Sequence, residues 1–203
     1  TVAAVDINRE ELERVVGEIT AAGGKAFAET VDVTSSAAVD RMVATVVERC
    51  GTVDILVNGA GGFHRLSPIT EISDEEWERV ISLNLTSAFY CTRAAARVMT
   101  DKKFGRIISI SSGAGLAPNP HAPSYAPYGA AKAGVIGMSK LIARDLGPYN
   151  ITVNCIAPGT TLTPRVKAVR DAESIARIAE MNPMRHLVEP EDTAEAALYL
   201  ASK

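Results

Sequence analysis

Cysteine, histidine and aromatic residues are scarce in this chain, and each scarcity excludes a class of site. Of the 203 residues, 5% are aromatic, three are cysteine and three are histidine. Cys50, Cys91 and Cys155 are far apart and lack Cys-x-x-Cys spacing, which argues against a disulfide framework or a thiolate metal centre. The histidines are equally scattered. We therefore expect buried or half-buried free thiols, a reducing and hence cytoplasmic location, and no metal site.

A charge excess and long apolar runs are also missing. The 21 basic and 24 acidic residues give a formal net charge of −3, which argues against nucleic acid or an anionic membrane surface as a partner. No apolar run approaches the roughly 20 residues that a membrane-spanning helix needs. What is abundant is small and aliphatic: 47% of the chain is hydrophobic. That supply suits one large α/β domain with an aliphatic core.

Strand-like and helix-like segments alternate along the whole chain. Short apolar runs predict strands over 2–5, 26–31, 53–57, 106–110 and 151–156. Helical patterns follow over about 8–22, 37–50, 73–99, 172–180 and 190–201. A further predicted helix carries Tyr128 and Lys132 and ends at about residue 146. This alternation predicts βαβ units, and hence a three-layer α/β fold with a doubly wound parallel sheet and helices on both faces.

Three of the predicted helices carry start signals. Asn8 with Glu11 has the spacing of a reciprocal capping box, and so has Ser73 with Glu76. Pro190 suits the first position of the last helix.

Tyr128 and Lys132 lie four residues apart in YGAAK, downstream of a strand that ends at Ser111 and Ser112. Residues i and i+4 share one face of a helix. A tyrosine has a reference pKa of about 10, too high for a base near neutrality. A unit positive charge at roughly 4 Å favours the phenolate by about 4 kcal/mol at an effective dielectric of about 20. The pair therefore suits proton transfer to and from an alcohol or carbonyl oxygen, although Tyr-x-x-x-Lys alone is a weak signal.

Other polar and glycine residues follow the carboxyl ends of the predicted strands, where ligands bind in parallel sheets. These positions are Asp6, Asp32, Asn58–Gly62, Ser112 and Pro158-Gly159.

Five strings occur in the order seen in short-chain dehydrogenases/reductases: NGAGG, SLNLTSAF, RIISISS, YGAAK and NCIAPG. The chain resembles that family from Val2 to Ala201. The resemblance implies a Rossmann-like fold, hydride transfer between NAD(H) and a secondary alcohol or ketone, and a homotetramer.

The resemblance also implies catalytic roles. Tyr128 is the expected acid/base, and Lys132 is expected to lower its pKa and to bond the nicotinamide ribose. Ser112, rather than Ser111, is expected to hold the substrate oxygen, and Asn84 to hold a water that links Lys132 to solvent. The structural alternatives are that Ser112 simply ends a strand and that Asn84 caps or kinks its helix.

Cofactor contacts are implied by the same resemblance. Asp6 is placed to accept hydrogen bonds from the adenosine ribose and to repel a 2′-phosphate, which favours NAD over NADP, although Arg9 lies nearby. Asp6 alternatively only caps the first helix. Thr163 is the candidate for the nicotinamide carboxamide, with Thr160 and Thr161 as rivals. The remaining expected contacts are Asp32, Val33, Asn58, Ala60, Gly61, Tyr128, Lys132, Pro158 and Gly159.

The substrate pocket is the least determined part. His64, His121 and Tyr125 are candidates to bond a polar substrate group, and Arg165 to pair with an anionic one. Each is alternatively a solvated loop side chain. The alternatives for the whole protein are an NADPH-dependent 3-oxoacyl-type ketoreductase and a non-catalytic dinucleotide-binding protein.

One family feature is absent from the sequence shown. The Gly-rich phosphate-binding loop precedes the ribose-binding acid by about 20 residues in such folds, but here that acid is the sixth residue. We expect residues 1–203 to form a single domain that is a fragment with both ends incomplete. Its sheet is expected to have two unpaired edges. The 203 residues shown are expected to bind dinucleotide poorly or not at all.

Overall fold

The computed structural model describes residues 1–63, 66–118, 125–169 and 171–202. It has five strands in this part of the chain, all paired in parallel: β1 (Val2–Asp6), β2 (Ala26–Thr30), β3 (Ile55–Asn58), β4 (Gly105–Ile110) and β5 (Ile151–Ile156). Each lies within two residues of its predicted bounds. The predicted α/β class is confirmed.

The helices follow the strands as expected, with one interruption. Where one helix was predicted over 73–99, the structure has α3 (Asp74–Ile81), a π-helical turn η2 (Ser82–Thr86) and α4 (Ser87–Lys102). The short 3-10 turns are η1 (Ile69–Glu71), η3 (Gly113–Gly115) and η4 (Gly147–Tyr149). The other α-helices are α1 (Arg9–Ala21), α2 (Ser36–Cys50), α5 (Ala126–Leu146), α6 (Pro164–Val169), α7 (Ala172–Met181) and α8 (Pro190–Ala201).

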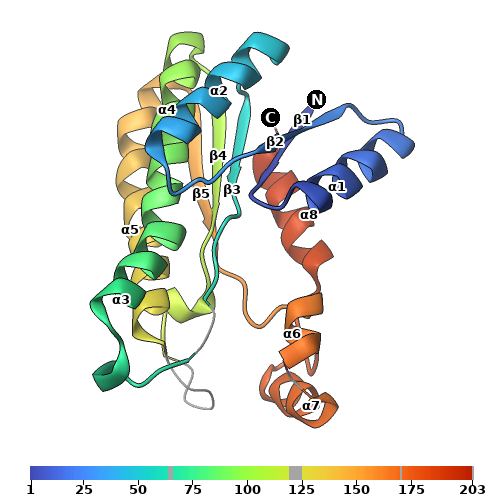
Figure 1. Cartoon of the computed structure of the whole chain (residues 1–203), viewed down its shortest axis with the longest axis vertical. Helices are drawn as coiled ribbons and strands as arrows, with labels where there is room; N and C mark the ends of the chain where they lie inside the picture. Colours follow the sequence, from blue (N-terminus) through green and yellow to red (C-terminus); the bar gives the residue numbers. More distant parts are fainter. Residues whose placement is uncertain (64–65, 119–124, 170, 203) are drawn as a thin grey trace.

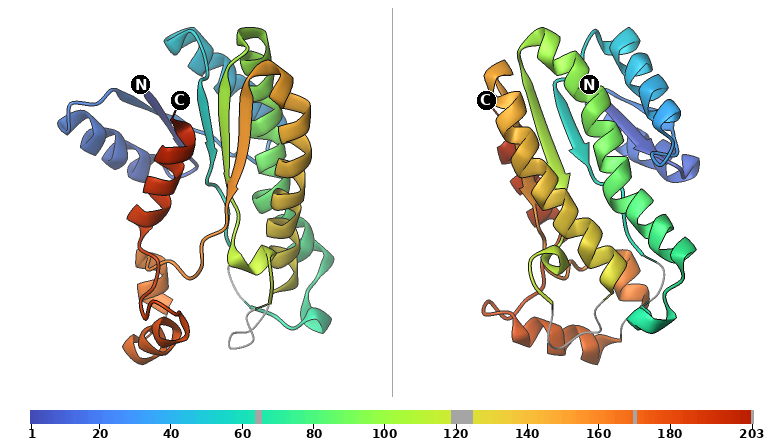
Figure 2. Two further views of the ribbon diagram at one scale, coloured as in Figure 1. Left: turned by 180° about the vertical axis from the view of Figure 1, so that it is seen from behind. Right: turned by 90° about the vertical axis from the view of Figure 1, so that its left-hand side faces the viewer.

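Helices cover both faces of the β3–β4–β5 sheet. Figure 1 and Figure 2 show α2, α4 and α5 on one face and α8 on the other. The core lies between β4 and the layer formed by α2, α4 and α5. There Ala95 and Met99 of α4 pack with Ile107 of β4 and Leu146 of α5. A second cluster joins α2 to α4. Burial of β4 on both faces explains why its centre, Ile107 and Ile108, is apolar at two consecutive positions.

The parallel strands form two sheets, β1–β2 and β3–β4–β5. Among the described residues no ladder joins β1 to β3, so each has an unpaired edge, as the sequence predicted. Ile55 and Val57 of β3 are accordingly about half exposed.

The helix starts agree with the sequence in part. Asn8 caps α1, but its own N–H donates to Asp6 rather than to Glu11, which instead binds Arg14. That part of the prediction is wrong, because a closer carboxylate at the strand end takes the donor. Pro190 begins α8 as expected.

The expectation that the thiols are buried or half-buried is wrong for Cys50, which is exposed.

The unequal burial of two isoleucines gives a test of this core. Ile108 of β4 is 0% exposed and Ile55 of β3 is 47% exposed. We expect Ile108→Ala to lower the free energy of unfolding by about 2–5 kcal/mol, because it leaves a cavity, and Ile55→Ala by less than about 1 kcal/mol. Urea denaturation of both variants measures this. Equal losses would contradict the described packing.

Candidate active site

The loops that follow β3, β4 and β5 leave the same end of their sheet, the lower end in Figure 1. This end collects Asn58–Gly62, Ser111, Ser112 and Pro158-Gly159. Helix α5 packs against β5, η2 and η3, which places its first turns beside these loops.

Tyr128 and Lys132 lie on one side of α5, as the i, i+4 spacing predicted. The Lys132 Nζ is 5.6 Å from the centroid of the Tyr128 ring. Lys132 is only 4% exposed, and its Nζ donates to the Ile110 carbonyl at 2.8 Å. Burial lowers the pKa of the Lys132 ammonium, while the neighbouring Cys155 has a smaller, opposing effect. The Lys132 charge is therefore lost at a lower pH than that of an exposed lysine.

Asn84 ties the NGAGG loop to the helix that carries η2. Its Oδ1 accepts from the Gly62 N–H at 2.8 Å, and its Nδ2 donates to the Gly62 and Val80 carbonyls at 2.8 and 2.9 Å. The side chain is buried. Asn84 thus has a structural role within the π-helical turn, namely fixing the loop at Gly62. Its water-holding role stays a prediction.

Gly61 lies against both of these groups. A Cβ at this position would be 2.6 Å from the Asn84 Oδ1 and 3.1 Å from the Lys132 Nζ. Glycine at this position lets the loop approach Asn84 and the buried ammonium.

The two serines after β4 have different partners. Ser111 is buried, and its Oγ donates to the Lys132 carbonyl at 2.7 Å, which fixes α5 to the strand end. Ser112 is half-buried, and its Oγ accepts from the Ala114 N–H at 3.2 Å at the start of η3. Gly115 allows this turn to sit on α5, because a Cβ there would be 2.6 Å from the Lys132 carbonyl carbon.

An aromatic cluster that was not predicted from the sequence adjoins Tyr128. The Phe63 ring centroid is 4.9 Å from that of Tyr128 and 5.3 Å from that of Tyr125. Tyr125, a substrate candidate, is 6% exposed, and its hydroxyl donates to the Glu76 Oε1 at 2.5 Å. The only sequence signal for Phe63 was its place directly after NGAGG. His64, His121 and the side chain of Arg165 lie outside the described residues.

The expected adenosine contacts lie at the ends of β1 and β2. Asp6 is exposed and accepts from the Asn8 N–H at 2.9 Å. Arg9 pairs with Glu13 at 2.7 Å on the surface of α1. Asp32 accepts from the backbone and hydroxyl of Thr34, and these hydrogen bonds lower the pKa of its carboxyl. The neighbouring side chain, Val33, packs against the α2–α4 cluster.

The other expected cofactor residues have mixed surroundings. Asn58 is buried, and its amide donates to Thr92 and Ser109 at 3.0 and 3.2 Å, so it ties β3 to α4 and β4. Ala60 is exposed. The Pro158 carbonyl accepts from Gly113, and the Thr163 Oγ1 from Val166 at 3.3 Å.

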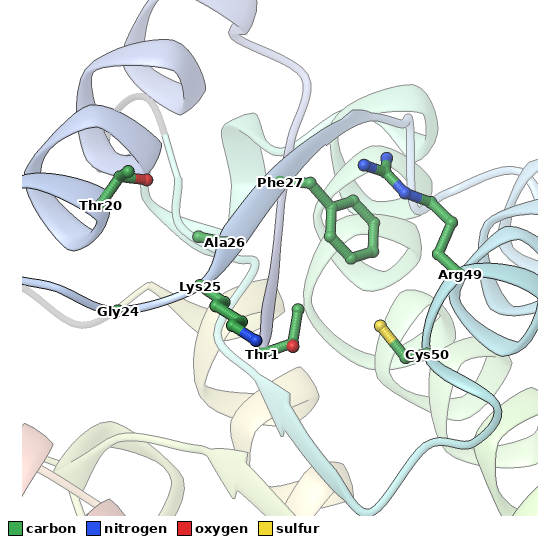
Figure 3. A pocket seen from close by; sticks show the side chains of 8 residues that line it. All are labelled: Thr1, Thr20, Gly24, Lys25, Ala26, Phe27, Arg49 and Cys50. Atoms are coloured by element: carbon green, nitrogen blue, oxygen red, sulfur yellow. The ribbon is translucent and has the colours of Figure 1, made fainter.

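A separate hollow of about 370 Å³ lies between Thr1, Lys25, Arg49 and their neighbours (Figure 3). Most of its lining residues precede β1, β2 or β3 in the chain, and the other two, Ala26 and Phe27, are the first residues of β2. They therefore mark the amino ends of these strands, whereas ligands of parallel sheets bind at the carboxyl ends.

The described ranges contain no group of three or more His, Cys, Asp or Glu side chains arranged to hold a metal ion. None of the helices within them has the length and apolar character to cross a membrane.

Known proteins resemble this chain over nearly its whole length. A family model described as Enoyl-(Acyl carrier protein) reductase matches residues 1–203. The (2S)-[(R)-hydroxy(phenyl)methyl]succinyl-CoA dehydrogenase subunit BbsD of Thauera aromatica is 37% identical over 97% of this chain and 77% of its own length. A 3-oxoacyl-[acyl-carrier-protein] reductase of Synechocystis is 38% identical over 94% of this chain and 74% of its own.

This chain belongs to the short-chain dehydrogenase/reductase family. Solved structures agree with that assignment. A 7α-hydroxysteroid dehydrogenase complexed with NADH and a 7-oxo bile acid superposes with a TM-score of 0.93 at 35% identity, covering 100% of this chain and 77% of that one. An NAD⁺-bound xylitol dehydrogenase has a TM-score of 0.90 at 30% identity, covering 100% of this chain and 83% of that one. ElxO with NADP bound has a TM-score of 0.90 at 26% identity, covering 99% of this chain and 81% of that one. Proteins of this fold therefore bind either dinucleotide.

The crowding around Gly61 is open to a direct test. We expect Gly61→Ala to lower the free energy of unfolding by about 1–3 kcal/mol, because the added methyl meets Asn84 and Lys132. The matched control is Gly59→Ala in the same loop, where nothing lies within 4 Å of an added Cβ. Urea denaturation compares the two. If both variants unfold alike, the loop does not lie against the ammonium.

Proposed function

We propose that this short-chain dehydrogenase/reductase catalyses reversible hydride transfer between NAD(H) and a secondary alcohol or ketone. The observation that carries the proposal is the pairing of Tyr128 with the buried Lys132 on one side of α5, with 5.6 Å between the Nζ and the ring centroid. A buried cation beside a phenol makes the phenol a stronger acid, and so a proton donor and acceptor suited to neutral pH.

Each residue of the site has one task in this proposal. During oxidation the Tyr128 phenolate takes the proton of the substrate hydroxyl, and during reduction the phenol returns it. Lys132 supplies the positive charge that stabilises the phenolate. The half-buried Ser112 hydroxyl donates to the substrate oxygen. A bound nicotinamide supplies or takes up the hydride.

The residues present fit the two ribose groups of such a cofactor. The exposed carboxylate of Asp6 suits the two hydroxyls of an adenosine ribose, and the Lys132 ammonium suits those of the nicotinamide ribose. Gly59 and Ala60 are exposed, and nothing lies within 4 Å of a Cβ added at Gly59, so backbone is open to close approach. Arg9, the cation that would favour NADP, is paired with Glu13. We therefore propose NAD.

Two alternatives remain distinct from this proposal. An NADPH-dependent 3-oxoacyl ketoreductase is favoured by the Synechocystis relative and by the Thermotoga maritima reductase FabG, which is 35% identical over 100% of this chain and 80% of its own length. Dissociation constants for NADH and NADPH separate it from the proposal. A non-catalytic dinucleotide-binding protein would bind cofactor without turning over any member of a broad alcohol and ketone panel.

A homotetramer is also part of the proposal. It rests on the family resemblance, because Ala94 and Ala95 of α4 and Ala131 of α5 are buried within the subunit. Exposed positions on α5 include Leu141 and Gly137, and nothing lies within 4 Å of a Cβ added at Gly137. Sedimentation velocity measures the assembly.

The acid/base assignment predicts how removal of the Tyr128 hydroxyl affects turnover. We expect Tyr128→Phe to reduce turnover by at least about 100-fold, because the proton donor and acceptor is lost. The dissociation constant of NADH, measured by fluorescence titration, should stay near the wild-type value. Tyr149→Phe, at an exposed tyrosine beyond the other end of α5, is the control and should leave both unchanged. Substantial turnover by Tyr128→Phe would count against the mechanism.

The proposed NAD preference predicts how removal of the Asp6 charge affects the choice between NADH and NADPH. Asp6→Asn keeps an oxygen that accepts from the Asn8 N–H but removes the repulsion of a 2′-phosphate. We expect the ratio of NADPH to NADH affinity to rise about tenfold, equivalent to about 1.4 kcal/mol. Asp40→Asn on the surface of α2 is the matched control. An unchanged ratio, measured by titration with both cofactors, would show that Asp6 does not select the cofactor.

A further inference from the structure

Three aromatic rings from two segments of the chain meet at the start of α5. Phe63 comes from the loop after β3, Tyr125 is the residue before the first turn of α5, and Tyr128 lies within that turn. Phe63 lies between the two tyrosines, 5.3 Å from the Tyr125 centroid and 4.9 Å from that of Tyr128. It meets the Tyr128 ring edge to face, at an interplanar angle of 61°. Such contacts favour one ring orientation.

Tyr125, one end of this aromatic cluster, is hydrogen-bonded to helix α3. The Tyr125 hydroxyl donates to the Glu76 Oε1 at 2.5 Å, a short hydrogen bond of the kind that a carboxylate acceptor forms. Glu76 lies in the first turn of α3, and its N–H donates to Ser73, which caps that helix. Helix α3 packs against α5. Tyr125 is 6% exposed, so this hydrogen bond is shielded from water.

We propose that Phe63, Tyr125 and Glu76 are positioning residues that hold the Tyr128 ring where its hydroxyl meets the substrate. This inference rests on the proposed function. Lys132 stabilises the Tyr128 phenolate, but its Nζ is 5.6 Å from the ring centroid and donates to Ile110, so it leaves the ring orientation open. The edge contact with Phe63 restrains that orientation from the loop side. Glu76 restrains Phe63 in turn through Tyr125.

Misplacement of a reacting group by about 1 Å is enough to cost about 100-fold in rate. A positioning role therefore predicts a loss in kcat that is not matched by a loss in cofactor affinity. We expect Phe63→Leu and Glu76→Ala each to lower kcat about 10- to 100-fold, with NADH binding unchanged and KM changed less than threefold. Glu76→Gln keeps an oxygen that accepts from the Tyr125 hydroxyl, so it should recover most of the lost rate.

A second measurement needs neither cofactor nor turnover. With fluorotyrosine in place of tyrosine, the fluorine NMR resonance of Tyr128 is identified by its absence from Tyr128→Phe. We expect one sharp resonance in the unaltered protein, and a broadened or split one in Phe63→Leu and Glu76→Ala. Phe104→Leu is the matched control, because Phe104 is also half-buried but lies at the amino end of β4. It should change neither the resonance nor kcat.

The outcomes separate the two proposals. If the unaltered protein turns over and Tyr128→Phe does not, while Phe63→Leu and Glu76→Ala keep full kcat and an unchanged resonance, the positioning role is wrong and the proposed function stands. The milder Tyr125→Phe, which removes only the hydroxyl bound to Glu76, decides the matter if either variant fails to fold. The opposite result is that the unaltered protein has no turnover, while the Tyr128 resonance broadens in Phe63→Leu and Glu76→Ala. In that case the cluster orders Tyr128 and the proposed function fails.

Discussion

The burial of one ammonium group constrains most of the site. A buried charge is tolerated only where hydrogen bonds replace its water, and Lys132 donates to the Ile110 carbonyl at the end of β4. The surrounding contacts follow from that placement. Ser111 holds the Lys132 carbonyl, Gly115 lets η3 sit on the same turn of α5, and Gly61 lets the loop after β3 approach the Nζ. These positions therefore pack around Lys132, through its backbone at Ser111 and Gly115 and through its ammonium at Gly61.

Several polar residues first attributed to ligand binding hold the fold together. Asn58 connects β3 to Thr92 of α4 and Ser109 of β4, and Asn84 bonds both backbone groups of Gly62. These roles are compatible with a site, because a loop that contacts a cofactor must itself be held. They also explain why amides serve here, since one amide side chain both donates and accepts.

The described strands form two sheets that no ladder joins. The β3–β4–β5 sheet is covered by helices on both faces, whereas β1 and β2 pair only with one another. Asp6, the proposed selector of the cofactor, belongs to the smaller sheet, and Tyr128 and Lys132 adjoin the larger one. The proposed cofactor therefore spans both sheets, and its affinity depends on how they are held together.

Local sequence determined the strands, most helix bounds and the pairing of Tyr128 with Lys132. Continuous apolar runs specify strands buried on both faces, and an i, i+4 pair shares a helix face whatever surrounds it. Tertiary structure decided the rest. The partners of Asn58 lie 34 and 51 residues away, and Glu76 lies 49 residues from Tyr125. Such contacts arise from where helices and loops meet, which no local pattern encodes. The same reason explains the missed π-helical turn and the place of Phe63 beside Tyr128.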